Sequence, residues 1–126
     1  MACFIVPGAE AIIAAAASKI ISIGEEKGLI HSEENAAPLS EKVSWLAKLG
    51  GGGSALLAFE HLWHGEISPF FPFLTAAADP EEISIMLREM AAVGTSMALL
   101  ITAVWIGMIV ITSSARKKAA KEVHIK

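Results

Sequence analysis

Charged residues are unevenly distributed along this 126-residue chain, and long apolar segments separate them. The clearest segment runs from Met90 to Ala115 and contains no charged residue over 26 positions. As an α-helix it would be roughly 39 Å long, which exceeds the thickness of the hydrocarbon core of a bilayer. Asp79 and Pro80, followed by two glutamates, are a typical helix start. The pattern therefore predicts one helix over 79–115.

Two further apolar segments predict helices over 7–23 and 40–64. The first is rich in alanine, which suits helix packing, and it lacks the basic start of a cleaved signal peptide. The second has an apolar part, 49–63, of only about 22 Å, so it spans a bilayer only if its polar ends reach both interfaces. Its four consecutive glycines, Gly50 to Gly53, indicate a close-packing surface or a hinge, although GGGGS also matches an engineered linker.

The positions of the basic residues predict the orientation, because lysines and arginines close to a span resist translocation. Nine of the ten positive charges lie around the loop 24–39 or in the basic tail 116–126, and the segment 64–89 carries only Arg88. We therefore expect an all-α, polytopic protein of the plasma (inner) membrane, with three transmembrane helices and a cytoplasmic C-terminus. In the alternative topology the first helix lies in the interface and the chain spans the membrane twice.

The segment 65–78 differs from the polar loop 24–39. Two prolines break any helix there, while three phenylalanines favour an apolar setting. The residues concerned are Pro69, Pro72, Phe70, Phe71 and Phe73. We expect a re-entrant or interfacial turn on the outer side, whose backbone groups need partners from neighbouring helices.

Composition agrees with a membrane protein: 54% of the residues are hydrophobic, 18% are charged and the mean hydropathy is +0.57. A soluble chain of this length has too little interior to hide that apolar content. A net charge of −3 does not indicate nucleic-acid binding. The single cysteine, Cys3, excludes an intramolecular disulfide and is expected to be a small apolar residue, with lipidation as an alternative. No nucleophile with a base, phosphate-binding glycine loop or redox cysteine pair is recognisable, so we expect no enzyme.

One stretch, AFEHLWHGEISPFFPF, concentrates ionisable side chains at the end of the second helix. Glu60 and His64 are four positions apart and His61 lies three before His64, so all three could converge on one divalent transition metal such as zinc, iron, copper or nickel. This spacing is less specific than an H-E-x-x-H motif. The residues that could complete the coordination shell are Glu66, Glu89 and Glu10.

Two other hypotheses for this stretch remain open. In the first, the cluster hydrogen-bonds the broken backbone of the following turn and anchors the second helix at the interface. In the second, Glu60 and Glu10 face each other inside the membrane and relay protons or bind a cation, with Glu66 and Glu89 as further relay candidates, since ionisable residues in spans are costly and usually functional. Haem ligation by a histidine is a third possibility. Thr95, Ser96 and Thr102 are expected to form hydrogen bonds between helices.

The stretches GGSALLAFEHLWHGEISPFFPFLTAAADP and MAAVGTSMALLITAVW resemble a family of small bacterial or archaeal integral membrane proteins with no assigned activity. The resemblance implies a membrane location and assigns a role to no residue. Because so small a bundle buries little, we expect it to associate with itself or with another membrane subunit as an accessory or assembly subunit. The alternative is an ion-handling protein that uses the Glu/His cluster. The lipid bilayer is a partner in either case.

Overall fold

A computed structural model describes residues 2–31, 36–71 and 73–125 of the chain. This part of the chain is all-helical, as the hydropathy pattern predicts. Its four α-helices are α1 (Ile5–Glu26), α2 (Leu39–Trp63), α3 (Pro80–Glu89) and α4 (Thr95–Ile125). Two shorter helical segments complete it: a 3-10 turn, Thr75–Ala78, precedes α3, and a π-helical turn, Met90–Gly94, joins α3 to α4.

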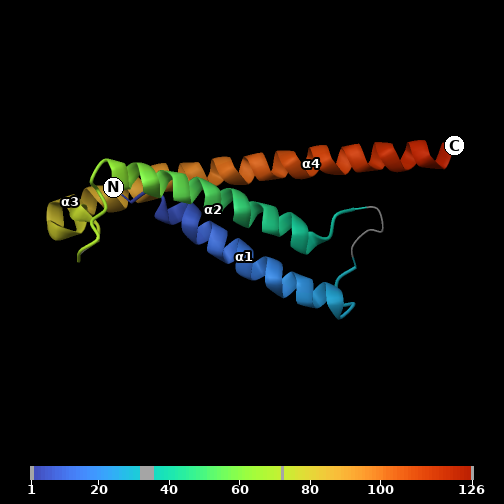
Figure 1. The fold of residues 1–126 in the computed structure, drawn as a ribbon, viewed down its shortest axis with the longest axis horizontal. Helices are drawn as coiled ribbons and strands as arrows, with labels where there is room; N and C mark the ends of the chain where they lie inside the picture. Colours follow the sequence, from blue (N-terminus) through green and yellow to red (C-terminus); the bar gives the residue numbers. More distant parts are fainter. Residues whose placement is uncertain (1, 32–35, 72, 126) are drawn as a thin grey trace.

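The helices form a long, narrow bundle (Figure 1). Helices α1 and α2 run antiparallel and pack mainly against each other, while α4 passes alongside both. The N-terminus lies near α3 at one end of the bundle, and the connection between α1 and α2 lies toward the other end, where α4 continues beyond both helices to the C-terminus. Three passes along the bundle axis therefore connect its two ends.

The four consecutive glycines of α2 have three different surroundings. Gly50 is buried against α1, where an added Cβ would lie 3.1 Å from the Cβ of Ala11 and 3.2 Å from the carbonyl oxygen of Pro7. Gly53 faces α4, where an added Cβ would lie 3.3 Å from Ile101 Cδ1. Gly51 and Gly52 face open space. The close-packing surface predicted from the sequence therefore exists at Gly50 and Gly53, and the two central glycines are left exposed.

The end of α1 caps the start of α2. Leu39 N–H donates to Glu25 Oε1 at 2.8 Å, and the Ser40 hydroxyl donates to Glu25 Oε2 at 2.5 Å. The Ser18 hydroxyl donates to the carbonyl of Ser40 at 2.7 Å. A carboxylate satisfies free N–H groups and complements the helix dipole at this position, although Pro38, the residue at the N-cap, offers no side-chain cap.

The predicted helix start at Asp79 is confirmed, because its Oδ1 accepts from Glu81 N–H at 2.9 Å and Pro80 takes the first helical position. The helical path continues through the π-turn and α4 to Ile125, ten residues beyond the predicted end at 115. The sequence ARKKAAKEVH of the tail consists mostly of strong helix formers, which explains the extension. The basic tail is thus the last part of one long helix.

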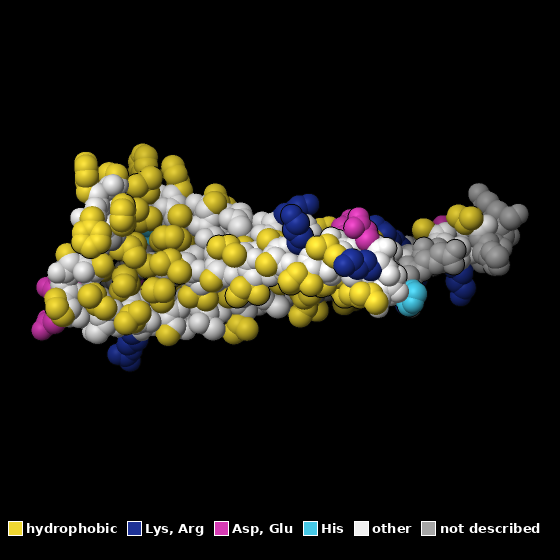
Figure 2. Space-filling view, turned by 90° about the horizontal axis from the view of Figure 1, so that it is seen from below, with side chains coloured by type: hydrophobic (Ala, Val, Ile, Leu, Met, Phe, Trp, Pro, Cys, Tyr) yellow, Lys and Arg dark blue, Asp and Glu magenta, His cyan; other side chains and the backbone are white. Residues whose placement is uncertain are grey.

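Very few side chains are buried in the described residues. Those with the least exposure are small or lie at the bundle's ends: Ala2, Cys3, Pro7, Ala11, Ala14, Ala37 and Met86. Large apolar side chains remain exposed on every long helix, and Figure 2 shows a band of hydrophobic side chains in which charged groups are absent, between charged groups at both ends. The bundle therefore covers little of its own apolar surface.

Two helical segments are long and apolar enough to cross a membrane, Ile5–Glu26 and Pro80–Val123. Three such helices were expected from the sequence. The helix that does not meet the requirement is α2, because charged residues lie near both of its ends, Lys42 and Lys48 in the first half and Glu60 in the second, and four glycines of low hydropathy lie between them.

The turn after α2 forms its own hydrogen bonds, which differs from the expectation that neighbouring helices would supply them. Ser68 N–H donates to the carbonyl of Phe73 at 2.8 Å, and Thr75 N–H donates to that of Glu66 at 3.1 Å. An isolated antiparallel bridge pairs Ile67 with Leu74. The segment is a small hairpin that leaves its phenylalanine side chains exposed, Phe71 at 87%. Pro72 lies outside the described residues.

Candidate functional site

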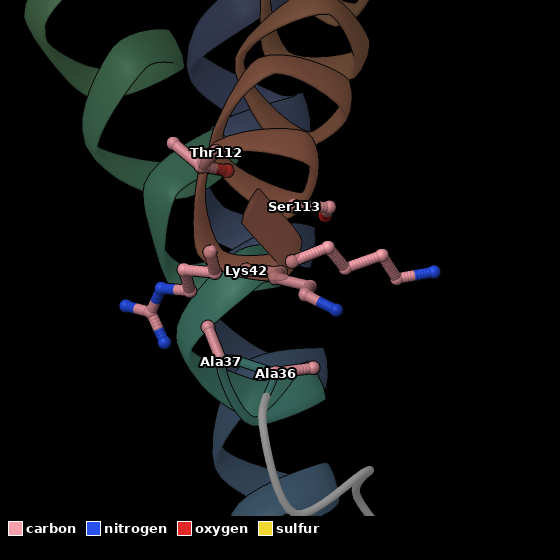
Figure 3. A pocket seen from close by; sticks show the side chains of 7 residues that line it. Ala36, Ala37, Lys42, Thr112 and Ser113 are labelled. Atoms are coloured by element: carbon pink, nitrogen blue, oxygen red, sulfur yellow. The ribbon is translucent and has the colours of Figure 1, made fainter. Parts of the chain in front are cut away.

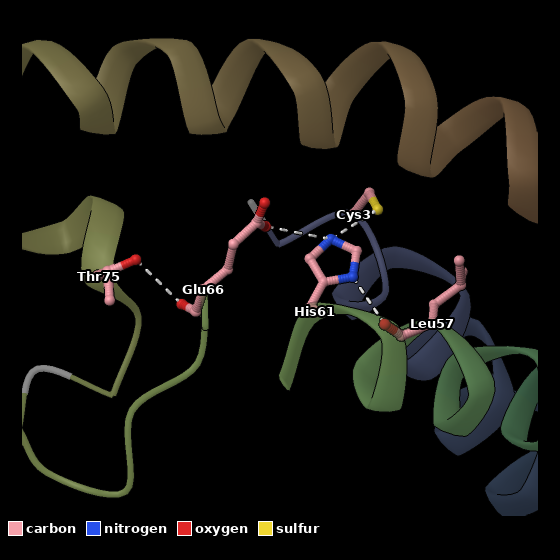
Figure 4. Close-up of polar contacts among 5 residues, drawn as sticks. All are labelled: Cys3, Leu57, His61, Glu66 and Thr75. Carbon is pink, nitrogen blue, oxygen red and sulfur yellow. Dashed lines mark hydrogen bonds and ion pairs between the residues drawn. The ribbon is translucent and has the colours of Figure 1, made fainter. Parts of the chain in front are cut away.

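His61 is the centre of the polar cluster at the end of α2 (Figure 4). Its ring Nδ1 lies 2.6 Å from the carbonyl oxygen of Leu57, and its Nε2 lies 3.3 Å from Cys3 Sγ. Because a carbonyl can only accept, Nδ1 carries the proton and Nε2 of the neutral ring can accept from the thiol. The Phe4 ring packs edge-on against the imidazole at a centroid distance of 5.5 Å. Both nitrogens of the imidazole therefore have protein partners.

A tight reversal at the end of α2 brings Glu66 back toward His61. Gly65 adopts a left-handed conformation with φ of +74°, and its N–H donates to the carbonyl of Leu62. Glu66 N–H donates to the carbonyl of His61 at 3.0 Å. This pair of hydrogen bonds is the Schellman arrangement that a glycine after a helix end allows. It places Glu66 Oε2 3.8 Å from His61 Nε2, and the Thr75 hydroxyl, at 3.2 Å from the Glu66 carbonyl, holds the same segment.

Glu60 and His64 do not join His61 in one ligand set. Both side chains are exposed, whereas His61 is only 11% exposed. One step along an α-helix turns by about 100°, so a His61 directed into the helix interface leaves its neighbour Glu60 outside. In the part of the chain that the structure describes, no three His, Cys, Asp or Glu side chains are placed to hold a metal ion. The metal-binding hypothesis therefore has no geometric support.

A cavity of about 170 Å³ adjoins the cluster. Glu60, His61, His64 and Glu66 line it together with Cys3, Leu57 and Met97. Four of the six candidate residues named from the sequence thus border one space, although without converging. Glu89, the last residue of α3, and Glu10 are not among the residues that line it.

Glu10 is directed at α4 and not at Glu60. The Thr102 hydroxyl of α4 donates to Glu10 Oε1 at 2.5 Å. The second carboxyl oxygen, Oε2, is buried and has no hydrogen-bond partner in the described structure. The prediction that Thr102 hydrogen-bonds between helices is confirmed, whereas Ser96 donates to the carbonyl of Ala92 in its own helical segment. The hypothesis that Glu10 and Glu60 face each other is therefore not supported, and Glu10 forms a carboxyl–hydroxyl pair with Thr102 instead.

The pair of Cys3 and His61 was not predicted from the sequence. The two residues are 58 positions apart, and no local spacing indicates their contact. A thiol within hydrogen-bond reach of an imidazole is the arrangement of a nucleophile with its base. Cys3 is nevertheless only 9% exposed, so its sulfur is poorly accessible to a reacting atom, and the arrangement does not support an enzymatic proposal.

The accessibility of Cys3 gives a first prediction. We expect N-ethylmaleimide to label the folded protein at least about tenfold more slowly than the protein denatured in SDS, because buried thiols are inert. Labelling followed by mass spectrometry measures both rates. Rapid labelling of the folded protein that His61→Gln slows would contradict this, since it would reveal an activated thiolate.

Comparison with known proteins adds no relative: no family model, no curated protein and no solved structure matches this chain. The family suggested by the stretches around the Glu/His cluster therefore remains a resemblance.

Proposed function

We propose that this chain is a multi-pass integral membrane protein that acts as an accessory or assembly subunit, associating with copies of itself or with another membrane subunit. The observation that best supports this is the face of α2 that the bundle leaves open. Gly51, Gly52 and Ala55 are exposed there, and an added Cβ at either glycine would meet nothing within 4 Å. Gly51 and Ala55 form a small-x-x-x-small pair, which permits close approach of a second helix in a membrane.

The residues around this open face indicate that a helix of another protein chain, and not lipid, contacts the glycines. Leu56 is 74% exposed and Phe59 63% exposed on the following turns. Small residues with flanking apolar side chains give a groove into which a neighbouring helix fits, and membrane helices associate through such packing. Lipid chains can cover the large side chains elsewhere on the bundle. The proposed partner therefore contacts α2.

The proposed topology has three spans, with the loop 24–39 and the tail on the cytoplasmic side of the plasma (inner) membrane. Helix α2 lies antiparallel along α1, so a bilayer crossed by α1 also surrounds α2. The first part of α2 is polar, and it is stabilised by packing against α1 and by the cap that Glu25 provides. The excess of lysine and arginine at that end supports the orientation.

Native mass spectrometry of the protein released gently from its own membranes tests the assembly. We expect a complex with further copies or with another subunit. The double variant Gly51→Leu/Gly52→Leu should weaken that complex at least about tenfold, because two large side chains prevent close helix approach. The control is Gly107→Leu, which adds a single leucine at a glycine of α4 that also faces open space. A wild-type protein that is monomeric throughout, or equal weakening by the control, would contradict the proposal.

A second candidate function is proton or cation handling, and Glu10 supports it. A carboxyl whose second oxygen is buried without a partner is costly to maintain, and ionisable groups within spans are usually functional. Here Glu10, with Thr102 orienting its other oxygen, would hold the proton or cation. The exposed positions of Glu60 and His64 do not support a role for them in the same site.

A further inference from the structure

A second cavity is lined by basic side chains (Figure 3). It lies where α2 begins, whereas His61 lies near the other end of that helix (Figure 1). The cavity lies between the start of α2 and the C-terminal half of α4 and has a volume of about 140 Å³. Lys42 reaches it from α2, and Arg116 and Lys117 reach it from α4. Thr112 and Ser113 line its other side. Three basic side chains from two helices therefore line one small space.

These charges are not neutralised by the described part of the protein. None of the described residues that line the cavity is acidic, and no ion pair joins Lys42, Arg116 or Lys117 to a carboxylate within that part. An anion placed among these side chains would be attracted by all three positive charges. The cavity is thus electrostatically suited to an anion.

Hydrogen bonds fix the geometry of the cavity. Trp105 Nε1–H donates to the carbonyl of Lys42 at 2.6 Å, which ties the start of α2 to α4. The hydroxyls of Thr112 and Ser113 donate to carbonyls of their own helix, Met108 at 2.7 Å and Ile109 at 2.6 Å. Because these hydroxyl protons are already used, the cationic side chains supply the attraction for an anion.

The position along α4 indicates which anion reaches the cavity. Thr112 and Ser113 belong to the last turn of the uncharged stretch 90–115, and Arg116 is the first charge after it. In a bilayer that surrounds this stretch, the cavity lies at the depth of the lipid headgroups. Lysines and arginines at that depth on the cytoplasmic side attract anionic lipids, and basic pockets between helices bind their headgroups.

We propose that this cavity binds a phosphate group, namely that of an anionic phospholipid of the surrounding leaflet. The Arg116 guanidinium can pair with two phosphate oxygens, while Lys42 and Lys117 act as point charges. The apolar surface of α4 next to the cavity then contacts the acyl chains. The proposal rests on the proposed membrane location, and it adds a ligand to a part of the molecule separate from the α2 face.

The test uses the full chain in detergent micelles and measures lipid adducts by native mass spectrometry. The probes are dioleoyl phosphatidylglycerol, dioleoyl phosphatidylcholine with the same acyl chains, and inorganic phosphate alone. The pocket variant is K42Q/R116Q/K117Q. The matched control is K48Q/K118Q/K121Q, which removes the same number of charges from the same two helices at positions that do not line the cavity. Circular dichroism verifies that both variants are helical.

We expect the wild type to prefer phosphatidylglycerol over phosphatidylcholine by about tenfold, the control to keep this preference and the pocket variant to lose it. Equal loss in both variants would overturn the proposal, because it would show a general attraction to the basic surface. If the pocket residues are needed to bind inorganic phosphate but the protein shows no preference between the two lipids, the ligand is free phosphate and not a phospholipid, and the proposal is wrong. Alkaline carbonate extraction tests the membrane location separately. A protein that is not integral to the membrane is released by this treatment, whereas a membrane protein that merely lacks this lipid site stays in the membrane.

Discussion

Replacing Gly94 with alanine should lower the free energy of unfolding by about 2 kcal/mol, because the added methyl group overpacks a tight contact between the π-turn and the start of α1. A Cβ at Gly94 would lie 2.7 Å from Val6 Cγ2 and 3.0 Å from the carbonyl oxygen of Cys3. The side chain of Val6 can turn away, but the carbonyl of Cys3, just before α1, can move only if the backbone there shifts. SDS titration followed by circular dichroism measures the change.

Gly107→Ala is the matched control, since it adds the same atom on the same long helix where nothing lies within 4 Å. It should leave stability unchanged or raise it by up to about 1 kcal/mol, because alanine favours a helix over glycine. In the Gly94 variant, displacement of Cys3 should also speed its labelling by N-ethylmaleimide. Equal stability of the two variants would show that α1 does not pack against the π-turn.

Thr102→Val should cost about 2 kcal/mol in the protein that keeps Glu10, because it removes the hydrogen-bond donor that the described residues give to a partly buried carboxyl. The same change in a Glu10→Leu background should cost less than about 0.5 kcal/mol, since no acceptor is then left unsatisfied. The four proteins form a double-mutant cycle, and SDS titration gives the coupling energy. Equal costs in both backgrounds would contradict the contact.

The stability of the double variant also bears on ion handling. If Glu10→Leu/Thr102→Val is at least as stable as the wild type, then the polar pair is not required for folding. Proteoliposomes containing a pH-sensitive dye then report whether the wild type passes protons and whether Glu10→Gln abolishes the flux. Equal proton flux in both proteins would show that Glu10 does not carry protons. A double variant much less stable than the wild type would show that the Glu10–Thr102 pair is a structural contact.

Hydropathy and helix-capping patterns predict most of the fold because they are local. An uncharged stretch with Asp79 and Pro80 before it predicts the last helix and its start, and both are present. The extension through the tail was missed because the charges of ARKKAAKEVH were interpreted as a solvated tail, although those residue types favour a helix. The π-turn at Met90–Gly94 has no local signature, and its glycine lies against Val6 and Cys3, which are distant in the sequence.

The candidate site was predicted less well, because its geometry depends on contacts between distant residues. Spacing places Glu60, His61 and His64 near one end of a helix, but which of them is directed inward depends on how α1 packs. The partners of His61 and Glu10 are Cys3 and Thr102, at sequence separations of 58 and 92. In the turn after α2, which pairs with itself, Phe73 adopts a φ of +65°, a conformation that is uncommon for a residue other than glycine and that local sequence patterns do not indicate.

Because α4 continues into the tail without a break, a small change in the direction of the helix displaces its C-terminal end. The ten residues after Ala115 extend the helix by about 15 Å, beyond the ends of α1 and α2. A transmembrane helix adjusts its tilt to bilayer thickness. If the helix tilts by about 20°, the end of this extension moves sideways by roughly 5 Å. If α4 crosses a bilayer as proposed, Lys118 and Lys121 would therefore be displaced sideways when the thickness of that bilayer changes.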